Sequence, residues 1–345
     1  MARQGRCVNL SISQKTLTFC YAKPHQIVRS WLDQGASPGT VVSCQPGPGR
    51  DLCFEFAIND LQPARRVGGI PAGLILENQR LPYLFWIELK AGKLHLLERT
   101  DRGSYLQRKT VPISIGKYGF GKELEGDGKT PVGVYRITSF LNDEQLSDNY
   151  GFGAYPLNYP NTWDRISNRT GHGIWLHGLP KGTDKRPPQD SDGCVIVDNG
   201  TLEQFGLYIK AGESLFVLSE TLNWLPPGTK QPSADILEAI ERWREDWVTN
   251  DNAAYLANYH DDFTDTKRSL SEWKDYKTRV NGTKSYIKVD LSELSVVAYP
   301  GEENLVATRF YQRYESSNYR WQGWKQLLWL RDESGAWRIL YEGNE

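Results

Sequence analysis

Two short apolar runs, each beside a residue with acid–base or nucleophilic chemistry, constrain the fold of this chain most. Ile174-Trp175-Leu176 leads into His177-Gly178, and Cys194 leads into Val195-Ile196-Val197. The span between them, 179–190, holds three prolines, Gly182 and several charges, so we expect an exposed loop. Two buried strands joined by such a loop can bring an imidazole and a thiol together at their ends. That is the minimum apparatus of a cysteine nucleophile with a histidine base.

The cysteine count supports Cys194 as the reactive thiol without deciding it. The five cysteines stand at positions 7, 20, 44, 53 and 194. An odd number in an exported protein leaves one thiol free, and the isolated Cys194 is the natural candidate. One or two disulfides among the first four are expected only if the chain is exported. The competing interpretation is that Cys194 is an inert, buried small residue; its glycine neighbour and the polar loop favour the nucleophile.

Composition limits the partners of the chain. It has 41 basic and 42 acidic residues, a net charge of −1, which argues against the clustered basic surface of a nucleic-acid-binding protein. Its 12 tryptophans and 18 tyrosines fill protein cores or line a groove for sugars, and both interpretations stay open. No apolar run of about 18 residues predicts a transmembrane helix. No secretory signal peptide is visible, so a cytoplasmic chain and one lacking its export signal remain alternatives.

The first two thirds of the chain divide into an arm and a mostly β domain. Residues 1–80 show poor periodicity and many turn residues, which indicates an irregular N-terminal arm. From 81 to 220 the pattern predicts a hairpin over 83–97, strands at 111–115, 132–137 and 215–218, the two strands at His177 and Cys194, and a short helix at 202–205. Residues 141–170 are expected to form a long loop of the kind used as a lid or binding loop.

The last third predicts a separate α+β domain over 233–345, after a proline-rich linker at 221–232. Ser233 is a plausible N-cap for a helix whose apolar residues recur at helical spacing. Two more helices are expected at 253–259 and 271–280. Alternating stretches then predict antiparallel strands at 287–291, 296–299, 305–314, 321–330 and 337–341. Helices followed by a curved meander indicate a small α+β cone.

Three motifs in the β domain together resemble one family, that of the L,D-transpeptidase catalytic domain (YkuD type). They are Lys129-Thr130-Pro131-Val132-Gly133, Leu176-His177-Gly178 and Ser191-Asp192-Gly193-Cys194. They lie in the family's order, and His177 and Cys194 stand at a family-like interval. The resemblance implies a YkuD-type β-sandwich that acts on peptidoglycan stem peptides.

The resemblance also implies roles for individual residues. Cys194 is the nucleophile and His177 the base, while the carbonyl of Gly178 orients the imidazole. Gly193 lets backbone amides approach a tetrahedral intermediate, which gives an oxyanion hole. Ser191 shapes the loop. Two positions depart from the family: Asp192 replaces its second histidine, and Ile196 replaces its arginine, with Asn199 the nearest uncharged polar residue. These departures bear on cross-linking more than on the thiol chemistry.

Residues 233–345 resemble the nuclear transport factor two-like (SnoaL-type) fold. The two domains in this order are similar to the L,D-carboxypeptidases that trim peptidoglycan and affect cell shape. This implies a hydrolase in the periplasm or cell envelope that resolves a thioester with water and removes a terminal D-alanine. An L,D-transpeptidase that uses an amine acceptor is the alternative, as is a non-catalytic, glycan-binding envelope protein. A carbohydrate or small ligand in the cone is a further possible partner.

Other residues carry a functional and a structural interpretation. His172 lies five residues before His177, which on a strand puts the two on opposite faces; an auxiliary substrate-binding role is the minority interpretation. Ser191, Asp192, Trp175 and Tyr155 are candidates for the substrate cleft, although Trp175, Tyr155 and Tyr118 also suit a core. Three tryptophans of the cone suit its core: Trp321, Trp324 and Trp329. The Asp261-Asp262 pair suits a solvated turn. His177, Asp192 and Cys194 lack the paired spacing of zinc ligands, so neither metal nor cofactor is expected.

Overall fold

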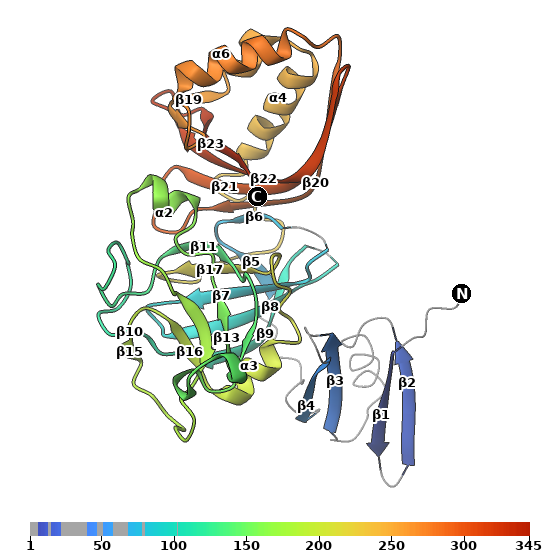
Figure 1. The fold of residues 1–345 in the computed structure, drawn as a ribbon, viewed down its shortest axis with the longest axis vertical. Helices are drawn as coiled ribbons and strands as arrows, with labels where there is room; N and C mark the ends of the chain where they lie inside the picture. Colours follow the sequence, from blue (N-terminus) through green and yellow to red (C-terminus); the bar gives the residue numbers. More distant parts are fainter. Residues whose placement is uncertain are drawn as a thin grey trace.

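The computed structural model describes residues 68–77, 80–101 and 103–345, and the backbone of four strands before them (Figure 1). These four form two antiparallel hairpins: β1 (Arg6–Ile12) with β2 (Lys15–Tyr21), and β3 (Thr40–Pro46) with β4 (Asp51–Ala57). The register sets Cys7 opposite Cys20 and Cys44 opposite Cys53. The side chains of these cysteines, and with them the expected disulfides, lie outside the described residues.

A seven-stranded sheet forms one layer of the β domain. Its strand order is β11-β17-β7-β8-β9-β5-β18. The strands are β5 (Gly68–Pro71), β7 (Tyr83–Glu88), β8 (Lys93–Arg99), β9 (Tyr105–Pro112), β11 (Gly133–Arg136), β17 (Leu215–Ser219) and β18 (Trp224–Leu225). The hairpin expected over 83–97 is confirmed as β7 and β8. The strand expected at 111–115 is divided, because β9 ends at Pro112, which has no amide hydrogen, and β10 (Ile115–Gly116) pairs elsewhere, with β15 (Gln189–Ser191).

A four-stranded sheet forms the second layer and carries the two strands that the sequence analysis started from. Its order is β12-β13-β14-β16, with β12 (Leu141–Asn142), β13 (Gly153–Pro156), β14 (Trp175–Gly178) and β16 (Val195–Val197). The stretch 141–170 is therefore not one long loop. It holds β12, β13, the 3-10 turns η2 (Asp143–Gln145) and η3 (Asp148–Tyr150), and the helix α2 (Thr162–Ile166).

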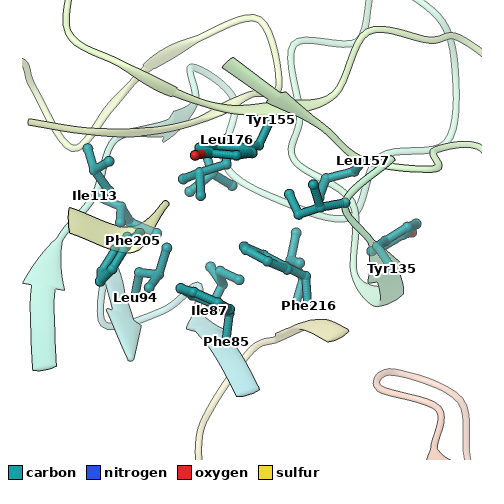
Figure 2. Packing of buried hydrophobic residues seen from close by; sticks show 14 of the residues in the cluster. Phe85, Ile87, Leu94, Ile113, Tyr135, Tyr155, Leu157, Leu176, Phe205 and Phe216 are labelled. Carbon is teal, nitrogen blue, oxygen red and sulfur yellow. The ribbon is translucent and has the colours of Figure 1, made fainter. Parts of the chain in front are cut away.

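The core of the β domain lies between these two sheets (Figure 2). Phe85, Ile87 and Leu94 of the larger sheet pack toward Tyr155 and Leu176 of the smaller one. The helix α3 (Asn199–Phe205), capped by the Asp198 carboxylate on the Thr201 amide at 2.8 Å, adds Leu202 and Phe205 to the same core. Burial on this scale is what holds a two-layer sandwich together. The expectation of a mostly β sandwich is confirmed.

The C-terminal part is the expected α+β domain. Its sheet has the order β19-β23-β22-β21-β20-β6. Three helices, α4 (Ile236–Val248), α5 (Asn252–Leu256) and α6 (Leu270–Asn281), accompany β6 (Leu74–Leu76), β19 (Tyr259–Thr264), β20 (Ile287–Ala298), β21 (Leu305–Ser316), β22 (Tyr319–Arg331) and β23 (Trp337–Asn344). The core of this domain contains Trp243, Trp247 and Trp329, all buried.

Several local details of this domain differ from expectation. The N-cap of α4 is Asp235, not Ser233; its side chain caps no amide and instead pairs with Arg331 at 2.9 Å. The two strands expected at 287–291 and 296–299 are one strand, β20, with a register shift between Ser292 and Ser295. Asp261 and Asp262 are exposed on the strand β19 rather than in a turn.

Strands from the expected N-terminal arm join both domains. β5 pairs with β9 of the larger sheet and with β18, which follows the last strand of the β domain. β6 pairs with β20, so that Leu76 lies opposite Val296 in the sheet of the C-terminal domain. Residues 68–76 are therefore structured, in contrast to the irregular arm expected for 1–80. Within the part of the chain described here, no helix combines the length and apolar character needed to cross a membrane.

Candidate active site

The strands β14 and β16 bring His177 and Cys194 to one face of the smaller sheet. The two strands are parallel, with Leu176 opposite Val195 and His177 opposite Ile196. Leu176 and Val195 belong to the core. Because side chains alternate along a strand, His177, and Cys194 one residue before Val195, fall on the opposite face. The sequence analysis predicts that these two residues meet at the ends of buried strands; the structure places them on one face of two adjoining strands.

The imidazole of His177 is held as a neutral base. Its Nδ1 donates to the carbonyl oxygen of Gly178 at 2.7 Å, so the proton sits on Nδ1 and Nε2 is free to accept another. Burial lowers the pKa of His177 to about 4, although the bond to Gly178 opposes that change. At neutral pH this side chain is therefore uncharged and able to take a proton.

Asn199 explains why glycine follows the histidine. Its Nδ2 donates to the carbonyl of Leu179 at 3.0 Å, and its Oδ1 accepts from the amide of Phe152 at 2.8 Å. A Cβ at Gly178 would stand 2.0 Å from that Oδ1. Asn199 thus packs directly against the Gly178 backbone and supports the carbonyl that orients His177.

The Cys194 thiol is protonated in this arrangement. Its Sγ donates to the carbonyl of Gly173 at 3.3 Å. Burial raises the pKa of Cys194 to about 11. A thiol in this state is a weak nucleophile, because the thiolate is the reactive form. Cys194 and His177 therefore present a neutral thiol and a neutral imidazole on the same face of the smaller sheet.

The turn before Cys194 is fixed by two hydroxyl groups. Ser191 Oγ donates to the carbonyl of Cys194 at 2.7 Å and accepts from the amide of Gly193 at 3.1 Å. Thr130 Oγ1 donates to the carbonyl of Gly193 at 3.0 Å and accepts from the amide of Gly116 at 2.9 Å. Ser191 and Thr130 therefore build the turn.

This turn leaves one backbone donor available at Cys194. The C=O and N–H of one planar peptide point in opposite directions, so the Cys194 amide points away from Thr130. No acceptor for that amide occurs among the described residues, whereas the Gly193 amide is occupied by Ser191. The Cys194 amide is thus the backbone donor left open at this turn. Glycine at 193 allows the turn, since its φ is +125° and a Cβ there would lie 2.7 Å from the Lys129 carbonyl oxygen.

The remaining candidates from the sequence lie around the site at different depths. Asp192 is exposed and pairs with Lys117 at 2.7 Å. His172 is exposed in the loop before β14, not on a strand, and lies 3.4 Å from Glu125. Trp175 is half-buried on the His177 face, but Tyr155 is part of the hydrophobic core. Tyr155 therefore faces away from the imidazole, because its register partner is Leu176.

Two residues near the site were not found by sequence reasoning. The ring of Tyr150, in η3, lies 5.0 Å from the rings of both His177 and Trp175. Arg186, in the loop between His177 and Cys194, donates from Nε to the Asp190 carbonyl at 3.0 Å and to Asp190 Oδ2 at 2.9 Å. Burial dominates the pKa of His177 and of Cys194, and the charge of Arg186 adds a smaller lowering to each. Both residues stand in loops, where no periodic pattern marks them.

Comparison with known families agrees with this geometry. Residues 82–217 match the family model of the L,D-transpeptidase catalytic domain, and residues 235–343 match that of the Cds6 C-terminal NTF2-like domain. The chain carries an L,D-transpeptidase catalytic domain followed by an NTF2-like domain. The catalytic domain belongs to enzymes that act on peptidoglycan peptides. A search of curated proteins gives no match.

Three solved structures are similar to this chain over 80% of its length. Bd1075 from Bdellovibrio bacteriovorus has 27% sequence identity and a TM-score of 0.68, over 80% of this chain and 98% of its own. The helical cell shape determining protein Pgp2 from Campylobacter jejuni has 26% identity and a TM-score of 0.64, over 80% and 96%. A single-residue mutant of Pgp2 has 26% identity and a TM-score of 0.67, over 80% of this chain and 93% of its own.

The NTF2-like domain contains a cavity of about 510 Å³. Its walls include Trp247, Trp273, Trp321, Gln312, Lys277, Lys325 and Glu342. Glu342 is paired with Lys325 and lies 3.9 Å from Lys277, whose ammonium also sits 4.5 Å from the centre of the Trp273 ring. Gln312 is buried, and its Oε1 has no hydrogen-bond partner among the described residues. Of the tryptophans expected in the core, Trp329 is buried, Trp321 borders the cavity and Trp324 packs against Arg309.

Proposed function

We propose that this protein is an L,D-carboxypeptidase that removes the terminal D-alanine of a peptidoglycan stem peptide through a thioester on Cys194. The observation that carries the proposal is the pairing of a neutral imidazole with a protonated thiol on one face of adjoining strands, beside the unoccupied Cys194 amide. The similarity to the helical cell shape determining protein Pgp2 also supports an enzyme that acts on peptidoglycan. The cell envelope is the expected location.

The site residues transfer each proton that the reaction moves. The thiol leaves the Gly173 carbonyl and passes its proton to Nε2 of His177, while Sγ attacks the scissile carbonyl carbon. The Cys194 amide donates to the resulting oxyanion. Collapse breaks the C–N bond, and His177 returns the proton to the departing amine of D-alanine. Water then attacks the thioester, His177 takes its proton, and the thiol is restored as the shortened peptide leaves.

Substrate recognition at this site is assigned to one cation from a loop, Arg186. The position of the family's arginine is occupied by Ile196, which is buried and bridged to Ser114. Arg186 keeps its Nη1 free of hydrogen bonds to the described residues, while Asp190 holds the rest of the guanidinium. A charged Nη1 with its N–H groups open suits a carboxylate, so we assign Arg186 the terminal carboxylate of the stem peptide. The transpeptidase alternative differs in its acceptor, which is an amine instead of water.

Digestion of defined tetrapeptide muropeptides, followed by mass spectrometry, tests this function. We expect a tripeptide product and free D-alanine with the wild-type protein and none with Cys194→Ala. A cross-linked dimer or an exchanged D-amino acid would instead make the protein a transpeptidase. No product under conditions where a control enzyme works would contradict both activities.

The non-catalytic alternative makes a different prediction about the thiol. Iodoacetamide should then modify Cys194 no faster than an ordinary buried thiol, with or without substrate. A muropeptide that forms a Cys194 thioester, detected on the intact protein by mass, is incompatible with a purely glycan-binding role.

We also propose that the cavity of the NTF2-like domain holds a carbohydrate or small ligand. Its tryptophans offer faces to a sugar ring, and Gln312 Oε1 offers an acceptor that is otherwise unpaired. Calorimetric titration of Cys194→Ala protein with uncleaved muropeptide should show binding that Gln312→Ala weakens. Unchanged affinity in that variant would contradict the assignment.

For the chain as a whole we retain the division into residues 1–80, 81–220, the linker 221–232, and 233–345.

A further inference from the structure

The segment between β13 and β14, residues 157–174, contacts the NTF2-like domain and also reaches Cys194. It contains α2 and ends at the Gly173 carbonyl that accepts the thiol hydrogen of Cys194. In Figure 1 α2 lies against the sheet of the NTF2-like domain, near β21. Several of its polar contacts are made by side chains of that second domain.

The first contact is at the start of α2. Asn161 caps the helix, because its Oδ1 accepts from the Asp164 amide at 2.9 Å. Its Nδ2 donates to the hydroxyl of Tyr299 at 2.7 Å and to the Val134 carbonyl at 3.0 Å. Asn161 and Tyr299 are each only 3% exposed, so water cannot readily replace this bond. The cap of α2 is therefore held from both domains.

The second contact is made by Glu302, in the turn between β20 and β21. Its Oε1 accepts from Trp163 Nε1 at 2.9 Å and from Arg169 Nη2 at 2.7 Å. Arg169 Nη1 also donates to Asp164 at 3.3 Å. The side chains of Arg169 and Glu302 are 22% and 28% exposed, so this ion pair is partly shielded from water and salt. One carboxylate thus fixes both the helix and the residue four positions before Gly173.

Apolar packing adds to these bonds. Trp163 and Ile166 lie against a cluster on the outer face of the NTF2-like sheet, made of Tyr299, Leu305, Ala307, Leu328 and Leu340. The ring of Trp163 stands edge-on to that of Tyr299, with 6.2 Å between the centroids. The second domain therefore forms a continuous support under α2.

Between Arg169 and Gly173 the chain is held by the catalytic domain at Thr170, which is bonded to Glu123, Glu125 and Tyr159. Gly171 and Gly173 follow with φ of +95° and +73°, and nothing lies within 4 Å of a Cβ built at Gly173. The Gly173 carbonyl therefore lies between two anchors: the bonded residues before it, and Ile174 after it, which is buried and accepts from the Leu157 amide.

We propose that Tyr299 and Glu302 of the NTF2-like domain are positioning residues for Cys194, which hold the Gly173 carbonyl against the thiol. The proposal rests on the proposed function only in taking Cys194 as the nucleophile. A carbonyl fixed at the thiol favours its protonated form. It also leaves the carbonyl in place to accept a peptide N–H of the substrate once the thiol turns to His177. The second domain thereby sets how reactive the cysteine is before substrate arrives.

The test compares Tyr299→Phe/Glu302→Ala with wild type and with Glu303→Ala. Glu303 lies in the same turn, is exposed and makes no hydrogen bond or ion pair with the described residues, so it is a matched control. Alkylation of Cys194 by iodoacetamide is followed against pH, with the Cys194 peptide resolved by mass spectrometry. Loss of the fixed carbonyl should lower the apparent pKa of the thiol by about one unit, which gives about tenfold faster alkylation near neutral pH.

The same variant should turn over muropeptide more slowly, because the carbonyl is no longer placed for the substrate, while Glu303→Ala matches wild type. Glu302→Gln keeps the acceptor for Trp163 and loses the ion pair, so we expect an intermediate shift, and it replaces the double variant if that fails to fold. An unchanged alkylation profile in a folded variant, or the same change in Glu303→Ala, would overturn the proposal. Since alkylation needs no peptide, a shifted profile without any peptide product in wild type would reject the proposed function alone.

Discussion

Replacing Thr130 by valine removes one hydroxyl that serves two backbone groups. Thr130 is fully buried, and valine has nearly its shape. The Gly116 amide loses its acceptor and the Gly193 carbonyl loses its donor, at 2.9 Å and 3.0 Å. An unpaired buried polar group costs roughly 1–3 kcal/mol. Two such groups are left unpaired, so we expect a loss of about 2–6 kcal/mol of stability.

The same change should weaken catalysis more than it weakens thiol chemistry. Without Thr130 the Gly193–Cys194 peptide can rotate, and the Cys194 amide then no longer points at the oxyanion. Loss of one such donor costs up to about 10²–10³ in kcat, so a fall of about 10-fold to 100-fold in tripeptide formation is expected from partial misalignment. Alkylation of Cys194 should change little, because it develops no oxyanion.

Urea unfolding and the muropeptide digest measure the two effects. Thr138→Val is the control, because that hydroxyl is exposed and donates to a single carbonyl, of Pro156, at 3.2 Å; exposed substitutions usually stay within about 0.5 kcal/mol. A Thr130→Val protein less than about 1 kcal/mol below wild type, or one with unchanged turnover, would refute the role given to this hydroxyl.

Three further perturbations follow from the buried groups. The pKa of His177 is about 4 in the folded protein and about 6.5 when unfolded. The contribution of His177 to stability is therefore complete above pH 6.5 and falls as the pH drops toward 4, by up to about 3 kcal/mol. His177→Gln should flatten this pH dependence in urea titrations, and a slope equal to that of wild type would contradict it. Gly193→Ala forces a Cβ to 2.7 Å from a backbone oxygen at a φ of +125°. This change should lower the melting temperature far more than Gly182→Ala, where the φ is +78° but the space is open. Equal losses in the two variants would argue against crowding at Gly193. Glu342→Gln leaves the buried ammonium of Lys325 without its carboxylate partner and should cost about 3–5 kcal/mol, of which Glu342→Gln/Lys325→Met should recover a part; a melting curve like that of wild type would show that the pair is dispensable.

The strands at the reactive residues could be predicted because burial leaves a mark in the sequence. Leu176 and Val195–Val197 are apolar since they enter the core, and the chemistry-bearing residue at each end breaks that run. Their pairing partner β13 could not be predicted in this way. Gly153 and Pro156 give it no β-forming pattern, and it exists because it pairs with β14.

The support of the site was hidden for a related reason. Thr130 was visible within its motif, but its two bonds connect residues 116 and 193, far apart in the chain. Tyr150 and Arg186 lie in loops whose course depends on tertiary contacts. Ser233 was a reasonable N-cap by residue type. The helix nevertheless begins after Asp235, which forms an ion pair with Arg331. Local preference was overridden by a charge from a distant strand.

The pairing of β6 with β20 has a consequence for how the chain is made. Leu76 and its partner Val296 are 220 positions apart (296 − 76), with the entire catalytic domain between them. At about 5–20 residues per second, β6 leaves the ribosome roughly ten to forty seconds before the strand that will complete it. During that time an apolar edge, Leu74–Leu76, is open to other chains. Nascent molecules of this protein should therefore depend on a chaperone or on early docking of β5, and a version that starts after residue 80 should leave β20 as an unprotected edge.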